Sequence, residues 1–175
     1  KFYTVDVHAP EILNDFSIPA KNLDPMTEIA NYVKTLNSMT EIANYIVIAP
    51  DKGAVSRSEQ FAAHLGGNIP VKLFSKERDV RTGEIEMYGD IDLSGHDVII
   101  SDDIIATGGT MANAIKISKK CGANKILAVG THALLLENAA YRILNAGADE
   151  IIGTDTIDTP VSKVSLAKLI AKQLE

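Results

Sequence analysis

One run of the sequence brings together residues that could bind a sugar phosphate. Residues 98–110 read Val-Ile-Ile-Ser-Asp-Asp-Ile-Ile-Ala-Thr-Gly-Gly-Thr, so an apolar strand leads into two carboxylates, Asp102 and Asp103, and then into a Thr-Gly-Gly-Thr turn. Glycines let the backbone approach a ligand closely, and free amides at a helix start favour phosphate. Carboxylates at the carboxyl end of a strand can accept hydrogen bonds from ribose hydroxyls or hold a hydrated Mg²⁺. The alternative interpretation is a plain strand–turn–helix junction.

The elements that must position this run follow an alternating pattern. Short β-branched segments alternate with longer segments of helical period, which favours an α/β fold with a mostly parallel sheet. We expect strands at 3–7, 45–49, 71–74, 98–101, 126–131 and 150–153, and helices at 25–36, 56–65, 110–120, 138–146 and 166–174. Gly122 and Gly147 each follow a predicted helix, as C-terminal cap glycines do. Asp24 before Pro25 fits an aspartate-capped helix start.

Two other segments need an interpretation. The polar stretch 76–95 contains one weakly alternating piece and predicts a mobile loop or a hairpin arm. The heptapeptide Met-Thr-Glu-Ile-Ala-Asn-Tyr occurs at 26–32 and again at 39–45. The first copy suits a helix, whereas the second has room only for a turn or a single helical turn before the next strand.

Length and composition restrict the class of protein. The chain has 175 residues, of which 46% are hydrophobic, so we expect a single domain over 1–175 with a sufficient core. Its apolar runs are too short to cross a membrane. A single cysteine, Cys121, excludes a disulfide framework and suits a reducing cytosol. The net charge of −6 argues against nucleic-acid binding. Because Lys1 opens directly on a predicted strand, we expect that a preceding segment is missing.

Several further residues could carry chemistry but are weaker signals alone. Asp51, Lys52 and Gly53 follow an apolar strand, where they form either a simple turn or a loop whose amides and lysine receive a pyrophosphate. His8 ends a predicted strand, and its alternation with Asp6 places both side chains on one face. A lone histidine there is more often structural than a ligand. The triplet 76–78, Lys-Glu-Arg, is in most proteins a solvated surface run.

The run 98–110 resembles the phosphoribosyl-pyrophosphate-binding motif of proteins with the type I phosphoribosyltransferase fold. Four further segments narrow the resemblance to the ribose-phosphate pyrophosphokinase family in its archaeal form. They are Thr-Val-Asp-Val-His at 4–8, Ala-Pro-Asp-Lys-Gly-Ala at 49–54, Lys-Glu-Arg at 76–78 and Gly-Thr-Asp-Thr at 153–156. The resemblance extends over essentially all 175 residues and corresponds to the C-terminal half of that family's usual chain.

The resemblance implies a doubly wound parallel sheet and a specific reaction. The family transfers pyrophosphate from Mg-ATP to the C1 hydroxyl of ribose 5-phosphate, which gives phosphoribosyl pyrophosphate and AMP. It is cytoplasmic, assembles as dimers or hexamers, and takes much of its adenine recognition from the N-terminal half. Two alternatives stay open: a phosphoribosyltransferase that consumes phosphoribosyl pyrophosphate, and a domain that binds ribose phosphates without catalysis.

The resemblance also assigns roles to residues. Mg²⁺ would be held by His8 and Asp51, and the pyrophosphate loop would comprise Asp51, Lys52 and Gly53. Lys76 would be catalytic, because it would stabilise charge on the transferred group. Ribose 5-phosphate would be bound by Arg78, Asp102, Asp103, Ala106, Thr107, Gly108, Gly109 and Thr110. No general base for the sugar hydroxyl is identified, although Asp102 or a metal-bound hydroxide could serve.

Overall fold

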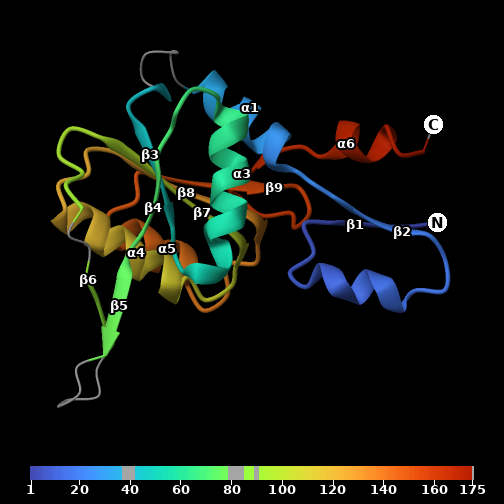
Figure 1. Cartoon of the computed structure of the whole chain (residues 1–175), viewed down its shortest axis with the longest axis horizontal. Coiled ribbons are helices and arrows are strands. Elements are labelled where there is room, and N and C mark those ends of the chain that lie inside the picture. Colours follow the sequence, from blue (N-terminus) through green and yellow to red (C-terminus); the bar gives the residue numbers. More distant parts are fainter. Residues whose placement is uncertain (37–41, 79–84, 89–90, 175) are drawn as a thin grey trace.

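The structure is a computed structural model of the chain, and it describes residues 1–36, 42–78, 85–88 and 91–174. For 75–78 and 85–88 it describes the backbone only. Six parallel strands form the central sheet, in the order β10-β9-β8-β7-β3-β4 (Figure 1). Their bounds are β3 Tyr45–Ala49, β4 Val71–Leu73, β7 Asp97–Ile105, β8 Ile126–Ala133, β9 Glu150–Thr154 and β10 Ser162–Val164.

Helices cover both faces of this sheet. On one face, α1 (Met26–Thr35) and α3 (Val55–Leu65) bury apolar side chains against odd-numbered β7 residues such as Ile99. On the other face, α4 (Gly109–Lys120) and α5 (Ala139–Asn145) pack on even-numbered ones such as Ile100. Because strand side chains alternate between faces, the buried β-branched runs can supply both cores. The prediction of a doubly wound α/β domain is confirmed.

Helix ends follow the capping signals of the sequence, except at the start of α1. Asp24 Oδ1 accepts a hydrogen bond from the Met26 amide at 2.8 Å, but the N-cap position of α1 is Pro25, so the helix starts one residue later than the predicted aspartate cap requires. Gly122 follows α4 with a φ of +92°, and Gly147 follows α5 with a φ of +112°. The amide of Ala123 donates to the Ser118 carbonyl at 3.0 Å, which is the bond pattern of a glycine-terminated helix. Both predicted cap glycines are confirmed.

The first predicted strand differs from the structure in extent and in pairing. β1 spans Phe2–Val5, and it pairs in parallel with β2 (Ala20–Leu23) as a separate two-stranded sheet, with the 3-10 helix η1 (Pro10–Asp15) between them (Figure 1). The predicted strand 3–7 was therefore too long at its end, because Asp6 adopts a φ of +44° and leaves the extended conformation. For the same reason, simple alternation does not relate Asp6 to His8.

The polar stretch 76–95 includes part of a hairpin. β5 (Ser75–Arg78) pairs antiparallel with β6 (Ile85–Tyr88), so that Lys76 lies opposite Met87 and Arg78 opposite Ile85. The hairpin extends away from the body of the domain (Figure 1). The hairpin form of the predicted arm is thus observed, while residues 79–84 and 89–90 lie outside the described part.

Smaller differences concern the duplicated segment and the C-terminal region. The first copy lies in α1, whereas the second copy, of which 39–41 lie outside the described residues, runs into β3 at Tyr45. β2 and β10 were not predicted, and α6 covers only Ala167–Ala171 of the predicted 166–174. In the described residues, no helix is long and apolar enough to cross a membrane.

Candidate functional site

A cavity of about 840 Å³ opens at the carboxyl ends of β3 and β7. Its lining includes His8, Asp51, Arg57 and the acidic pair at 102–103. A smaller cavity of about 110 Å³ adjoins it and is formed by residues 102 and 104–111. Asp102 is among the residues that line both cavities. The structure therefore brings together residues from three of the sequence segments singled out above, 4–8, 49–54 and 98–110, at the sheet edge where α/β proteins bind ligands.

The smaller cavity is a cradle of backbone amides. Gly108 has a φ of +71°, and a Cβ atom there would lie 3.2 Å from the Ala139 Cβ. Gly109 differs, because a Cβ atom there would meet nothing closer than the Thr107 Oγ1 at 3.9 Å. In the described part of the chain, no acceptor is paired with the backbone amides of residues 106–110. Such free amides at a helix start can bind an anion.

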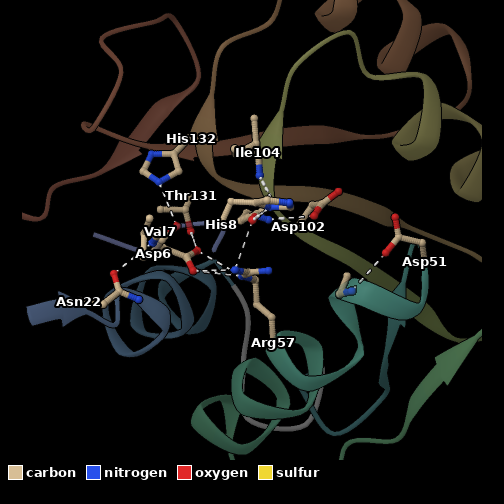
Figure 2. Close-up of polar contacts among 12 residues, drawn as sticks. Asp6, Val7, His8, Asn22, Asp51, Arg57, Asp102, Ile104, Thr131 and His132 are labelled. Carbon is tan, nitrogen blue, oxygen red and sulfur yellow. Dashed lines mark hydrogen bonds and ion pairs between the residues drawn. The ribbon is translucent and has the colours of Figure 1, made fainter. Parts of the chain in front are cut away.

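The two carboxylates of the acidic pair face opposite sides of β7. Asp103 points toward α3 and is 4% exposed, and its Oδ1 accepts from the Ile104 amide at 2.7 Å. Asp102 lies on the opposite face and lines both cavities, and its Oδ1 accepts from the Asp103 amide at 2.9 Å. The pair therefore presents one largely buried carboxylate, Asp103, which lines the larger cavity only, and one, Asp102, which lines both cavities. Asp102 is labelled in Figure 2.

The same asymmetry appears in the pKa values. Burial, together with the neighbouring Asp103 carboxylate, raises the pKa of Asp102 to about 7. Burial also acts to raise the pKa of Asp103, but the hydrogen bond with His8 and the charge of Arg57 outweigh it and lower that pKa. The bond to Asp103 in turn raises the pKa of His8. The site therefore holds one firmly ionised carboxylate beside one that titrates near neutrality.

His8 is placed by contacts that the sequence did not indicate. Its Nδ1 lies 2.6 Å from Asp103 Oδ2, while 77% of its side chain stays exposed to the cavity side. Arg57 lies beside this pair, with its Nη2 3.4 Å from the same Asp103 oxygen and 2.8 Å from Asp6 Oδ1 (Figure 2). Arg57 thus joins the carboxylate of β7 to the segment that carries His8.

Asp6 is the buried centre of this connection. It is 7% exposed, and its Oδ2 accepts from Arg57 Nε at 3.2 Å and from Thr131 Oγ1 at 2.5 Å. The imidazole of His132 lies with its Nε2 3.1 Å from the Val5 carbonyl oxygen (Figure 2). Arg57, Thr131 and His132 come from α3 and β8, so the sequence held no local signal of these contacts. His132 lines neither cavity, and its ring supports the end of β1 through the Val5 carbonyl.

The predicted metal ligands share the cavity but make different contacts. His8 bonds to Asp103, whereas Asp51 Oδ1 accepts from the Ala54 amide at 3.2 Å and so caps the short 3-10 helix η2 (Lys52–Ala54). A Cβ atom at Gly53 would lie 3.2 Å from that Asp51 oxygen. Among the described residues, no three His, Cys, Asp or Glu side chains form a ready-made metal site.

Lys76 and Arg78 are placed only by their backbone. Both lie in β5, the first strand of the hairpin that follows β4. Their side chains fall outside the described part of the structure. Their predicted roles toward the transferred group and the sugar phosphate therefore remain predictions.

Comparisons with known proteins agree with this geometry. The phosphoribosyl transferase domain matches residues 21–166. The ribose-phosphate pyrophosphokinase of Pyrococcus abyssi is 39% identical over 173 residues, which are 98% of this chain and 58% of that protein. The ribose-phosphate pyrophosphokinase of Sulfolobus acidocaldarius is 40% identical over 164 residues, which are 93% of this chain and 54% of that protein. The chain thus spans less than two thirds of the length of these curated relatives.

Solved structures give the same result. The crystal structure of phosphoribosylpyrophosphate synthetase from Mycobacterium smegmatis aligns with a TM-score of 0.80 and 28% identity, over 98% of this chain and 56% of that one. Adenine phosphoribosyl transferase from Trypanosoma brucei aligns with a TM-score of 0.54 and 19% identity. The alignment covers 86% of this chain and 76% of that one, so the two proteins share the fold. By its domain match, its fold and its amide cradle, the chain belongs to the phosphoribosyl transferase domain family.

Proposed function

We propose that this chain binds ribose 5-phosphate as part of a ribose-phosphate pyrophosphokinase. That enzyme would transfer a pyrophosphoryl group from Mg-ATP to the C1 hydroxyl of the sugar. The products would be phosphoribosyl pyrophosphate and AMP. The observation that carries the proposal is the free-amide cradle at 106–110, which adjoins a cavity of about 840 Å³ containing His8 and the acidic pair. The similarity to archaeal ribose-phosphate pyrophosphokinases supports the choice of reaction.

The proposed roles follow the two cavities. The 5-phosphate would lie on the amides of Ala106, Thr107, Gly108, Gly109 and Thr110 in the smaller cavity. The ribose hydroxyls would lie toward Asp102, which lines both cavities, and toward Asp103, which lines the larger one. The triphosphate would occupy the larger cavity beside the loop of Asp51, Lys52 and Gly53. Lys76 would stabilise charge on the transferred group, and Arg78 would hold phosphate oxygens.

The donor set of the larger cavity fits Mg²⁺ that is bound jointly by protein and substrate. Mg²⁺ retains water ligands and is commonly held by one or two side chains together with phosphate oxygens, so no closed cage of protein ligands is needed. His8 and Asp51 line the cavity and would supply these side chains. When bound, the ion would neutralise charge on the triphosphate. The acidic pair adds negative potential that favours a cation there.

The protein's own part in the reaction would be to position the substrates and to manage one proton. Holding the C1 hydroxyl near the triphosphate makes the encounter effectively unimolecular. Asp102 has a pKa of about 7, which suits a group that accepts the hydroxyl proton near neutral pH. On the same resemblance, we propose that the protein is a cytoplasmic homo-oligomer.

The test is a ³¹P NMR assay of the polypeptide that carries this sequence, with Mg-ATP and ribose 5-phosphate. We expect AMP and phosphoribosyl pyrophosphate to appear together in equal amounts. Release of pyrophosphate from phosphoribosyl pyrophosphate that requires a nitrogenous base would instead indicate a phosphoribosyltransferase. Binding of ribose 5-phosphate without any product would indicate a non-catalytic domain, and absence of binding would remove the proposal altogether.

A further inference from the structure

The loop at residues 134–138, which joins β8 to α5, has a strained backbone. Leu135, Glu137 and Asn138 have φ values of +53°, +51° and +62°. Residues other than glycine rarely adopt such values, and they persist only where the surroundings impose them. Among the described residues, Asp6 is the only other non-glycine residue with a positive φ, and it lines the larger cavity. Strain of this kind commonly marks a functional site.

The strained loop is bonded to the amide cradle. The Leu135 amide donates to the Ile105 carbonyl at 3.0 Å, and the Leu136 amide donates to the Ala106 carbonyl at 2.9 Å. These bonds bind the end of β7 to the loop on the side opposite the free amides.

Arg142 continues the same row of bonds. It lies in α5, and its Nη1 donates to the Thr107 carbonyl while its Nη2 donates to the Glu137 carbonyl at 3.4 Å. Three successive carbonyls, at 105, 106 and 107, are therefore all occupied by the 134–142 segment. The C=O and N–H groups of one trans peptide unit point in opposite directions. Holding the carbonyls of 105, 106 and 107 toward the loop therefore directs the amides of 106, 107 and 108 away from it, on the side of the small cavity.

We propose that Arg142 is a positioning residue of the phosphate cradle, and that residues 134–138 together with Arg142 form a brace that keeps the amides of 106–108 facing the ligand. The guanidinium acts through the Thr107 carbonyl and does not itself touch the sugar phosphate. The inference rests on the proposed function only in naming ribose 5-phosphate as the ligand. The brace itself is a property of the backbone, and it can be tested without substrate.

The experiment compares Arg142→Gln with Lys116→Gln, which removes an equal charge from an exposed position of α4. In ¹⁵N–¹H NMR spectra without ligand, we expect the amide signals of 106–109 to shift and broaden in Arg142→Gln only. Affinity for ribose 5-phosphate, measured by calorimetry, should fall roughly tenfold or more, the effect of losing a charge-assisted hydrogen bond. The KM for Mg-ATP should change little. Arg142→Lys keeps one donor and should restore part of the affinity.

Two outcomes would overturn the brace. The first is an unchanged set of 106–109 amide signals in Arg142→Gln, because the guanidinium would then not hold the loop. The second is an equal loss of ribose 5-phosphate affinity in Arg142→Gln and Lys116→Gln, because charge alone would then be responsible. If the wild type does not bind ribose 5-phosphate, the proposed function fails, while the substrate-free spectra still decide whether the brace exists.

Discussion

His8 Nδ1 and Asp103 Oδ2 lie 2.6 Å apart, although 95 positions separate the two residues in the sequence. The contact joins the segment after β1 to the carboxyl end of β7. It also keeps Asp103 ionised, since hydrogen bonding and the nearby charge of Arg57 stabilise the carboxylate against burial. The neighbouring Asp102 must then ionise beside a fixed negative charge, and its pKa rises to about 7.

This asymmetry predicts that Asp102→Asn changes stability in a pH-dependent way. The folded-state pKa of Asp102 is about 7, and the unfolded value is about 3.9. The folded protein therefore binds more protons between these values, and its free energy of unfolding falls as pH rises through that window. We expect Asp102→Asn to be more stable than the wild type at pH 8, on the order of 2 kcal/mol after allowance for partial solvation, with a much smaller gain at pH 5.

Urea unfolding at the two pH values measures this difference. Asp92→Asn is the matched control, because Asp92 is exposed to solvent and its pKa is lowered through hydrogen bonds from Ser94. That variant should show no gain at pH 8. An equal effect of Asp102→Asn at pH 5 and pH 8 would mean that the Asp102 carboxylate does not titrate between them.

The bond between Arg57 and Asp6 should stabilise the protein strongly. Three hydrogen bonds of 2.8–3.2 Å join the two side chains, and Asp6 is buried. Removing one partner leaves a buried charge without compensation, which costs about 3–5 kcal/mol. We expect Arg57→Met to lower the free energy of unfolding by about that amount. Lys119→Met, which breaks a half-exposed ion pair with Asp149 at 3.6 Å, should cost no more than about 1 kcal/mol.

Equal and small effects of these two variants in urea unfolding would contradict the role given to Arg57. Hydrogen exchange separates the local attachment of β1 to the main sheet from the stability of the whole protein. Hydrogen exchange in β1 should accelerate in Arg57→Met more than exchange in β8, because the arginine holds the end of β1 against the sheet.

The sequence was sufficient for the main sheet because each of its long strands is a continuous buried apolar run. Ile99 and Ile100 supply one core each from adjacent positions, so the pattern indicated a sheet covered on both faces. β2 was missed because only Leu23 of its four residues is buried. The end of β1 was misjudged because the left-handed conformation of Asp6 depends on Arg57 and Thr131, which are distant in sequence.

The candidate site also has a part that the sequence predicts and a part that it does not. The cradle at 106–110 was predictable, because strand, glycines and helix follow one another within a single run of residues. The hydrogen bonds from Leu135 and Arg142 that hold the cradle were not predictable. These residues lie in the β8–α5 connection and in α5, far from the cradle in the sequence. From the sequence, Asp102 and Asp103 were predicted to bind the ribose hydroxyls in the same way. Alternation along β7 places them on opposite faces, and only tertiary contacts make Asp103 the enclosed one.

The two cradle glycines should differ in their importance for folding. Gly108→Ala forces a left-handed conformation on alanine and brings its Cβ to 3.1 Å from the Ile143 Cδ1, so we expect a loss of about 1–3 kcal/mol. Gly109→Ala meets open space, and it should leave stability unchanged or slightly raised, since alanine favours the helix. Thermal unfolding checks both. Equal destabilisation by the two substitutions would contradict the described cradle geometry.

Lys76 is predicted to act on the chemical step. If it stabilises charge in the transition state, Lys76→Ala should lower kcat by roughly 10²-fold or more, with substrate constants altered much less. Steady-state kinetics of pyrophosphoryl transfer measure both. Arg78→Ala should instead raise the KM for ribose 5-phosphate as well, because a guanidinium binds phosphate in the ground state too. Wild-type turnover in Lys76→Ala would refute its catalytic role.

Calorimetric titration of ribose 5-phosphate into the wild type and into Gly109→Val tests the central claim most directly. The valine side chain would project into the small cavity, where a Cβ atom at position 109 has nothing closer than 3.9 Å in the protein. It should therefore displace the 5-phosphate while leaving the fold intact. The account predicts saturable binding to the wild type and a severe loss in Gly109→Val at an unchanged melting temperature. Equal affinity of the two proteins for ribose 5-phosphate would contradict it.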